Sequence, residues 1–173
     1  MRYEWGEYAF DGGVTVECPS ADVLRWLVMP DLMSRWIAGL DAVTLIDSQP
    51  DVVGARTRLD YGGGARSPGT FHGEVVELSD QVLVRCYRPA FGQDKYERTV
   101  RYDLRAIGAA TALRCSVQTR LLGLPAVLRR LPPRYEQVHL NRSLERLRSL
   151  AGGRQQLPLL RRIRDSGLQS QPL

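Results

Sequence analysis

The stretch that decides the fold is LPAVLRRLPPRYEQVHLNRSLERLRSLA, residues 124–151. Apolar side chains recur in it at spacings of three and four residues, the repeat of one face of an α-helix. Gly152 and Gly153 follow and predict where the helix stops. Because the chain before this stretch reads mainly as strands, we expect a long C-terminal helix that covers one face of a sheet.

The apolar residues of this stretch form two sets on different sides of the helix. Leu140 lies about 160° around the helix axis from Val138, so one straight helix does not place both sets against one surface. Pro132 and Pro133 disfavour helical geometry at the residue before them. We expect a kinked helix, or a short helix followed by a long one that starts near Pro133. The first set is Leu124, Leu128, Leu131, Tyr135 and Val138, and the second is Leu140, Leu144, Leu147 and Ala151.

Length and composition indicate a single domain with a sizeable core. The chain has 173 residues, of which 43% are hydrophobic. It lacks an apolar run of about 18 residues, the length of a transmembrane helix. Its first ten residues contain acids where a signal peptide has an apolar run, so we expect a cytoplasmic protein. Three widely spaced cysteines imply no disulfide framework, and we expect them to be buried thiols.

The charge is concentrated at the C-terminal end. Residues 124–173 hold ten Arg and three acids, whereas residues 1–123 hold 14 basic and 16 acidic groups. A basic arm can contact an anionic membrane surface, a nucleic acid or an acidic partner protein. This arm lacks interleaved aromatic residues, so we expect a solvated helix face, a mobile tail over residues 152–173 and no nucleic-acid partner.

Before the long helix, alternating apolar and polar residues predict an antiparallel meander with one solvated face. Two short helices come first: Ser20 is the expected N-cap of the helix over 21–28, and Pro30 opens a second helix over 32–37. The triplet Asp11-Gly12-Gly13 predicts a turn or bulge between short strand-like runs at 8–10 and 14–18. The six strands expected after the helices are 42–47, 53–61, 70–78, 81–88, 96–105 and 111–121, with longer loops at 62–69 and 89–94.

Several patterns across residues 8–151 carry a resemblance to a known superfamily. They are VECPSADVLRWL from Val16, PDLMSRWIAGLDAV from Pro30, VVGARTRLDY ending at Tyr61, FHGEVVELSDQVLVRCY from Phe71 and SLERLRSLA from Ser143. Together with the segment order, they resemble the START-like, or Bet v 1-like, helix-grip superfamily (SRPBCC), and within it the bacterial polyketide cyclase/dehydrase branch.

The resemblance implies an α+β helix-grip fold over residues 1–151. Its curved antiparallel sheet of six to seven strands surrounds the long C-terminal helix, and two short helices follow the first strand. The resemblance also implies an apolar cavity between the sheet and the long helix, and a hydrophobic small molecule as the ligand. Members of the superfamily include lipid carriers and aromatic polyketide cyclases, so the fold alone does not give the function.

Arg98 is the first candidate for chemistry in such a cavity. It shares the inward face of strand 96–105 with Tyr96, Val100 and Tyr102, and a buried guanidinium must be paired because it stays protonated. Arg98 binds a carboxylate, phenolate or enolate of the ligand, forms a structural ion pair with Glu74 or Glu97, or is exposed near the end of the strand.

Two histidines are candidates for proton transfer, since an imidazole ordinarily titrates near neutral pH. His72 lies in the middle of strand 70–78, where both alternations, Phe71-Gly73-Val75 and His72-Glu74-Val76, are compatible with an inward face. His139 lies beside the change of face in the long helix. In a cyclase, proton transfer would fall to His72 or a tyrosine, and oxyanion stabilisation to Arg98 or a tyrosine.

Aromatic side chains are the other candidate ligand contacts. Tyr61, Tyr96 and Tyr102 share their strand faces with apolar residues, and each inward hydroxyl needs a partner. Trp36 suits packing between the second short helix and the sheet, and Trp5 and Trp26 are interpreted in the same way. The candidate catalytic residues are Arg98, His72 and Tyr96, and the candidate ligand-binding residues are Trp36, Tyr61, Tyr87, Tyr102, Tyr135 and His139.

Several other classes of site are not supported. Two distant histidines and the absence of a Cys-x-x-Cys pair give no metal-site pattern, and we expect no metal or cofactor. The chain has neither a phosphate-binding glycine loop nor a Gly-x-Ser-x-Gly elbow. Three hypotheses stay open: a carrier of an aromatic or polyketide-like molecule, a cofactor-free cyclase or dehydratase, and a partner-binding protein that uses the basic arm. A dimer is compatible with all three.

Overall fold

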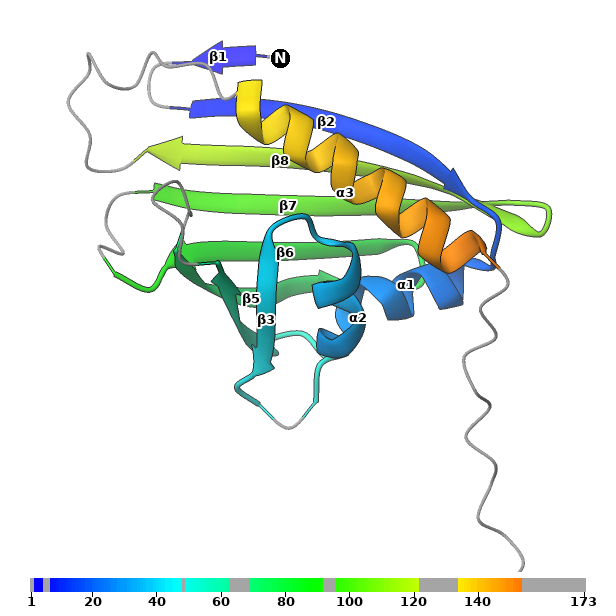
Figure 1. The fold of residues 1–173 in the computed structure, drawn as a ribbon, viewed down its shortest axis with the longest axis horizontal. Helices are drawn as coiled ribbons and strands as arrows, with labels where there is room; N and C mark the ends of the chain where they lie inside the picture. Colours follow the sequence, from blue (N-terminus) through cyan, green and yellow to red (C-terminus); the bar gives the residue numbers. More distant parts are fainter. Residues whose placement is uncertain are drawn as a thin grey trace, which may run out of the picture.

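The chain folds into a curved antiparallel sheet with helix α3 lying across one face (Figure 1). The helices in the described part of the chain are α1 (Ser20–Val28), α2 (Pro30–Trp36) and α3 (Arg134–Gly152). The strands are β1 (Arg2–Glu4), β2 (Glu7–Val16), β3 (Leu40–Leu45), β4 (Arg56–Tyr61), β5 (Thr70–Leu78), β6 (Val82–Pro89), β7 (Tyr96–Ile107) and β8 (Ala110–Leu121). This computed structural model describes residues 2–4, 7–47, 49–62, 69–91, 96–121 and 134–153.

The eight strands lie in the order β1-β2-β8-β7-β6-β5-β4-β3. Strands β3 to β8 form the predicted meander, and β2 lies beside the last strand, so the sheet curls around α3. The short edge strand β1 was not predicted and raises the strand number above the expected six to seven. The α+β helix-grip architecture predicted from the sequence is confirmed.

Strand β2 corrects the prediction of a turn at Asp11-Gly12-Gly13. It is continuous and pairs with β8 without a break, from Glu7 opposite Arg120 to Val16 opposite Thr111. A Cβ at Gly12 would lie 3.0 Å from Cδ1 of Leu144 in α3. Gly12 is therefore a point where helix and strand approach each other closely. A glycine is suited to such a contact for the same reason that it is suited to a turn, because it has no side chain.

The two short helices cover the sheet next to the C-terminal half of α3 (Figure 1). Ser20 is the first residue of α1, Pro19 occupies the N-cap position, and no side chain caps the helix, so the predicted Ser20 cap is wrong. The indole Nε1 of Trp36 donates a hydrogen bond of 3.0 Å to the Trp26 carbonyl and ties α2 to α1. Both tryptophans are buried in the core as predicted, whereas Trp5 lies outside the described residues.

Helix α3 shows the predicted change of face. Leu144 and Leu147 of the second apolar set are buried against the sheet, whereas Val138 of the first set is 62% exposed. The helix ends at Gly152, as expected. Residues 124–133, which carry most of the first set, and the tail from residue 154 lie outside the described residues.

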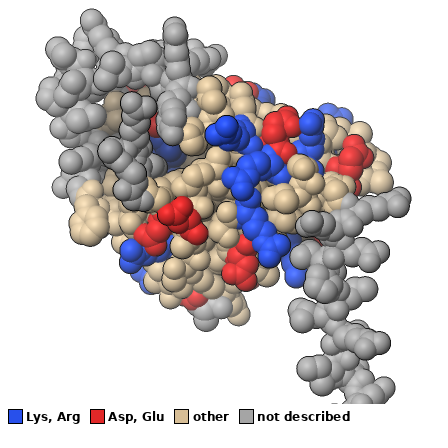
Figure 2. All heavy atoms as spheres, viewed as in Figure 1, with Lys and Arg blue, Asp and Glu red and all other residues tan. Residues whose placement is uncertain are grey.

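The outer face of α3 is charged. Its sequence has four Arg and two Glu, and Figure 2 shows basic side chains around this helix with acidic ones beside them. Arg148 pairs with Glu145 at 2.8 Å, one turn away. Among the described helices, none combines the length and the apolar composition that crossing a membrane requires.

Edge strand β3 is irregular. Its pairing with β4 shifts between Leu40 and Ala42, which leaves Asp41 in a bulge. The bulge lies next to Gly62, where a Cβ would come within 2.9 Å of the Asp41 carboxylate. The bulge thus bends β3 at its first residues, just after the chain comes out of α2.

The close approach at Gly12 gives a first prediction. Alanine in a strand normally stabilises relative to glycine by about 0.5–1 kcal/mol, but here the new methyl group would press on Leu144. We expect Gly12→Ala to lower the free energy of unfolding by about 1 kcal/mol, measured by urea denaturation. Gly13→Ala is the control, because its Cβ would meet only the Leu113 carbonyl oxygen, at 3.3 Å. A stabilised Gly12→Ala protein would contradict the helix position.

Candidate ligand-binding site

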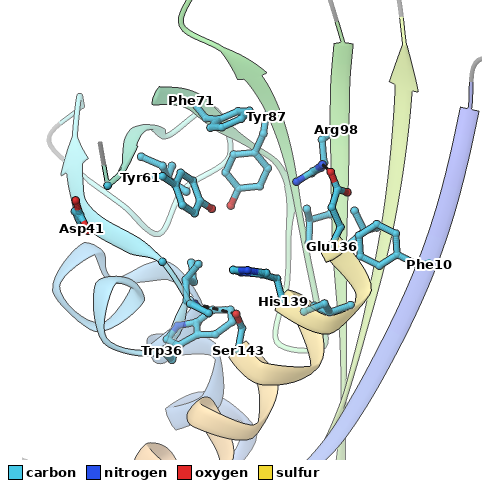
Figure 3. Close-up of a pocket in the computed structure, with 18 of the residues that line it drawn as sticks. Phe10, Trp36, Asp41, Tyr61, Phe71, Tyr87, Arg98, Glu136, His139 and Ser143 are labelled. Atoms are coloured by element: carbon cyan, nitrogen blue, oxygen red, sulfur yellow. Dashed lines mark hydrogen bonds and ion pairs between the residues drawn. The ribbon is translucent and has the colours of Figure 1, made fainter. Parts of the chain in front are cut away.

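A pocket of about 720 Å³ lies between the concave face of the sheet and α3 (Figure 3). Its volume is in the range of sites that hold small organic molecules. Most of its walls are apolar, and the polar groups come from β3, β4, β6, β7 and α3. The apolar lining includes Phe10, Trp36, Leu59, Phe71, Val100, Val117 and Leu140.

Strand alternation decides which side chains reach the pocket. In β5, Phe71, Gly73 and Val75 are buried, whereas His72 and Glu74 are exposed on the outer face. Of the two inward faces compatible with the sequence of β5, the structure has the one formed by Phe71, Gly73 and Val75. His72 points away from the pocket and does not line it, so its predicted role in acid–base chemistry there is wrong.

Tyr87 lies in the pocket because of a glycine on the neighbouring strand. Gly73 is opposite Tyr87 in the β5–β6 pairing, and a Cβ at Gly73 would come within 2.5 Å of the Tyr87 ring. The ring therefore lies over the bare backbone of Gly73. Its hydroxyl points into the pocket, and so does that of Tyr61 (Figure 3). A glycine in the middle of one strand opposite a tyrosine in the next is the sequence signal that could have predicted this contact.

The other predicted inward tyrosine of the described set, Tyr102, lies deeper. Its ring packs edge-on against Trp36 with centroids 6.4 Å apart, and both residues line the pocket. Burial raises the pKa of Tyr102 well above its usual value. Burial also raises the pKa of Tyr87, although the nearby Arg85 guanidinium acts in the opposite direction. Both hydroxyls therefore stay protonated at neutral pH and can donate hydrogen bonds.

Arg98 reaches the pocket and is paired with a residue that the sequence analysis did not consider. Its Nη2 donates to Glu136 of α3 at 2.7 Å, and its Nε donates to the Thr119 hydroxyl at 3.2 Å. Neither of the two acids proposed from the sequence is this partner, because Glu74 is on the outer face and Glu97 pairs with Arg88 at 2.6 Å. Contact of Arg98 with a ligand anion stays a prediction.

The ion pair of Arg98 and Glu136 is part of a larger network at one end of the pocket. The Tyr8 hydroxyl donates to the Glu136 carboxylate at 3.1 Å. Burial raises the pKa of Tyr8, and the Glu136 charge adds to this effect. The side chains of Arg98 and Glu136 are 25% and 29% exposed, so the pair is accessible from the pocket. Because the two groups carry opposite charges, the pair has no net charge.

Helix α3 supplies two further polar groups. His139 lines the pocket, and its ring points toward the space between Tyr61 and Tyr87 (Figure 3). The Ser143 hydroxyl accepts a hydrogen bond of 2.9 Å from the backbone N–H of Ala38 and ties α3 to the chain after α2. His139 is therefore the candidate for proton transfer that the structure brings to the pocket.

The remaining predicted site residues have mixed outcomes. Trp36 is a core residue, 2% exposed, and also lines the pocket, while its predicted contact with a ligand stays a prediction. Tyr96 lies in β7 and Tyr135 in α3, but their side chains lie outside what the structure describes. Their roles stay predictions. Among the described residues, no group of three or more His, Cys, Asp or Glu side chains could hold a metal ion.

Comparisons with known proteins support the fold. No family model matches the sequence, and no curated protein matches it. Among solved structures, Ara h 8.0201 is similar with a TM-score of 0.63 and 14% identity, over 85% of this chain and 97% of that one. A point mutant of norcoclaurine synthase from Thalictrum, in complex with a transition-state analogue, has a TM-score of 0.65 and 10% identity, over 87% and 97% of the two chains.

A third similar structure is the di-domain ARO/CYC protein StfQ from the steffimycin biosynthetic pathway. It has a TM-score of 0.65 and 13% identity, and the match covers 84% of this chain and 50% of StfQ. The chain therefore shares the helix-grip fold of these structures. At these identities the similarity establishes the fold and not an activity.

Burial of Tyr102 predicts how stability changes in alkaline solution. Above the ordinary tyrosine value of 10.0 the unfolded chain ionises this residue while the folded chain keeps it neutral. Stability therefore falls as pH rises from this value toward the higher pKa of the folded state, by about 1.4 kcal/mol per pH unit. Phenylalanine cannot ionise, so in Tyr102→Phe the free energy of unfolding should fall with pH less steeply than in the wild type, by about 1.4 kcal/mol per pH unit. Urea denaturation between pH 9 and 11 measures both slopes. Equal slopes for the two proteins would contradict the burial of this hydroxyl.

Proposed function

We propose that the chain binds a hydrophobic, aromatic or polyketide-like small molecule in the pocket between the sheet and α3. The observation that supports this most is a pocket of about 720 Å³ with apolar walls into which two tyrosine hydroxyls point. Such a site removes a ligand's apolar surface from water and leaves a few polar groups to orient it.

The shape of the wall favours a flat ligand. The rings of Tyr61 and Phe71 meet edge to face with centroids 5.8 Å apart, and Trp36 and Tyr102 make a second edge-to-face pair. Aromatic side chains offer faces and edges that match the charge distribution of another aromatic ring. An aromatic molecule of several rings is therefore a better match than a flexible aliphatic chain.

A cyclase or dehydratase is the second candidate function. It is favoured by the polar groups that reach the same space: the hydroxyls of Tyr61 and Tyr87 and the imidazole of His139. In such a reaction His139 would take a proton from a carbon next to a carbonyl, and Tyr87 would donate a hydrogen bond to the enolate oxygen that develops. The protonated imidazole would later return its proton to a leaving hydroxyl, which departs as water.

The fold is compatible with either function. Structures with a similar fold include an ARO/CYC protein and a norcoclaurine synthase, at 13% and 10% identity. A carrier would use the same pocket without proton transfer. The partner-binding hypothesis has the least support. It predicts a cavity filled by the protein's own side chains, whereas the described residues enclose a pocket of about 720 Å³. Cytoplasmic location, a mobile tail and the oligomeric state stay predictions.

Narrowing the pocket tests ligand binding directly. Val117 is 5% exposed and lines the pocket from β8, so Val117→Phe would place a ring inside it. We expect this variant to bind anthraquinone at least about tenfold more weakly than the wild type, a change of about 1.4 kcal/mol, measured by quenching of tryptophan fluorescence. Val76→Phe on the outer face of β5, where Val76 is 46% exposed, is the matched control and should bind normally.

Equal affinities of the two variants would exclude the pocket as the binding site. A wild-type protein that binds no member of a panel of polycyclic aromatics would contradict the proposal as a whole. Native mass spectrometry of protein purified from its source cells would show whether an aromatic molecule is retained.

Arg98 has its own test. Its guanidinium lines the pocket and is held by Glu136 and Thr119. If it also contacts the ligand, Arg98→Ala should weaken binding of the retained molecule about fivefold or more, the worth of one hydrogen bond. Arg88→Ala, which breaks the surface pair with Glu97, is the control. Unchanged affinity and unchanged turnover would remove Arg98 from both candidate functions.

A further inference from the structure

A second arginine lies behind the pocket wall, and the functions discussed so far do not use it. Arg85 comes from β6, where it shares the inward face with Leu83 and Tyr87. Its side chain is 1% exposed, which makes it one of the largest fully buried side chains of the described structure. A guanidinium does not lose its proton in proteins, so a full positive charge is buried here.

The surroundings of Arg85 compensate this charge only in part. Nη2 donates to the carbonyl of Val28 at 3.3 Å, Nη1 contacts the Met33 sulfur at 3.3 Å, and Nε has no hydrogen-bond partner. Val28 is the last residue of α1, so its carbonyl carries the partial negative charge of a helix C-terminus, roughly half an elementary charge. No ion pair among the described residues includes Arg85.

Tyr87 connects this charge to the pocket. The two side chains are alternate buried residues on the same face of β6. Burial raises the pKa of the Tyr87 hydroxyl, and the charge of the nearby Arg85 guanidinium acts in the opposite direction. The same hydroxyl points into the pocket (Figure 3). The other arginine of the pocket, Arg98, is neutralised by Glu136, so the uncompensated positive charge near Tyr87 belongs to Arg85.

We propose that the pocket takes its aromatic ligand as a phenolate or enolate anion, whose charged oxygen accepts a hydrogen bond from Tyr87 while Arg85 behind it supplies the countercharge. This inference rests on the proposed ligand-binding function and narrows it to acidic aromatic hydroxy compounds. Arg85 acts through Tyr87 and is a positioning residue. An anion at this place would complete the charge balance of the buried guanidinium, which a neutral ligand would leave incomplete.

The test uses alizarin, a dihydroxyanthraquinone whose colour changes when it ionises, and anthraquinone, which lacks the acidic hydroxyl groups. If the site prefers the anion, bound alizarin must ionise at a lower pH than free alizarin, because the two affinities and the two ionisation constants are linked. We expect a shift of at least about one pH unit, which corresponds to a tenfold preference for the anion. Anthraquinone should bind without a comparable pH dependence.

Two variants assign the effect. Arg85→Met removes the charge and keeps an unbranched side chain beside Met33, so bound alizarin should ionise at or above the pH of free alizarin, while anthraquinone affinity changes less than about twofold. Tyr87→Phe keeps the ring over Gly73, removes the hydroxyl and should reduce the shift in the same direction. Arg88→Met, on the same strand but exposed and paired with Glu97, is the control and should keep the full shift.

The effect of Arg85 on the ionisation of bound alizarin must be distinguished from the effects of other titratable groups in the pocket. His139 lines the same pocket, so the titration is repeated with His139→Gln, where the shift should persist. The other charged and titratable groups that line this pocket are Asp41 of β3, Tyr61 of β4, Arg98 and Tyr102 of β7, and Glu136 and His139 of α3. Cys115 of β8 lies opposite Tyr102 in the pairing of β7 with β8.

The outcomes are distinct. Bound alizarin that ionises at the same or a higher pH than free alizarin overturns this inference, and anthraquinone binding would then leave the proposed function intact. A shift that persists in folded Arg85→Met also overturns it, because the countercharge would lie elsewhere. If Arg85→Met does not fold, the wild-type titration and Tyr87→Phe decide the matter. Failure of both probes to bind contradicts the proposed function and this inference together.

Discussion

The structure depends on how α3 meets the sheet at only one of its ends. Leu144 and Leu147 are buried, and Gly12 on β2 lets this part of the helix approach within van der Waals distance. One to two turns earlier, His139 and Leu140 line a pocket instead of filling it. The helix is thus anchored by its second apolar set, and the change of face in the sequence is the reason why the first half of the described helix leaves room for a ligand.

Electrostatics divides the pocket into two unlike regions. At one end, Arg98, Glu136, Tyr8 and Thr119 form a network with no net charge, and its members are partly exposed. Pairs of this kind contribute little to stability but fix the orientation of their side chains. Behind the wall at Tyr87, Arg85 is buried, and within the described part of the chain its guanidinium has hydrogen bonds to a helix-end carbonyl and a sulfur. The two arginines therefore differ in what they can do, although both lie on inward strand faces.

The sequence was sufficient for the architecture and for part of the site. Clean alternation in β7 and β8 predicted that Arg98 and Tyr102 face inward, because period-two patterns assign relative faces along a strand. In β5 the same reasoning failed, since apolar residues occur on both faces and only pairing with its neighbours decides that His72 is outside. Gly12 was misinterpreted because a glycine that makes room for a helix has the same sequence signature as one in a turn. The pairing of Arg98 with Glu136 and the burial of Arg85 depend on tertiary packing, which local patterns do not contain.

The bulge at Asp41 matters for what the edges of the sheet can do. A strand at the edge of a sheet exposes unpaired backbone groups that can join a strand of another molecule, the route to domain swapping and fibres. Here one edge is β1, three residues long, and the other is β3, whose pairing is interrupted between Leu40 and Ala42. The bulge therefore works against the addition of a strand at β3. At the opposite edge β1 pairs with β2 only from Glu7 to Ala9, so the rest of β2 is the part of the described sheet where another strand could pair.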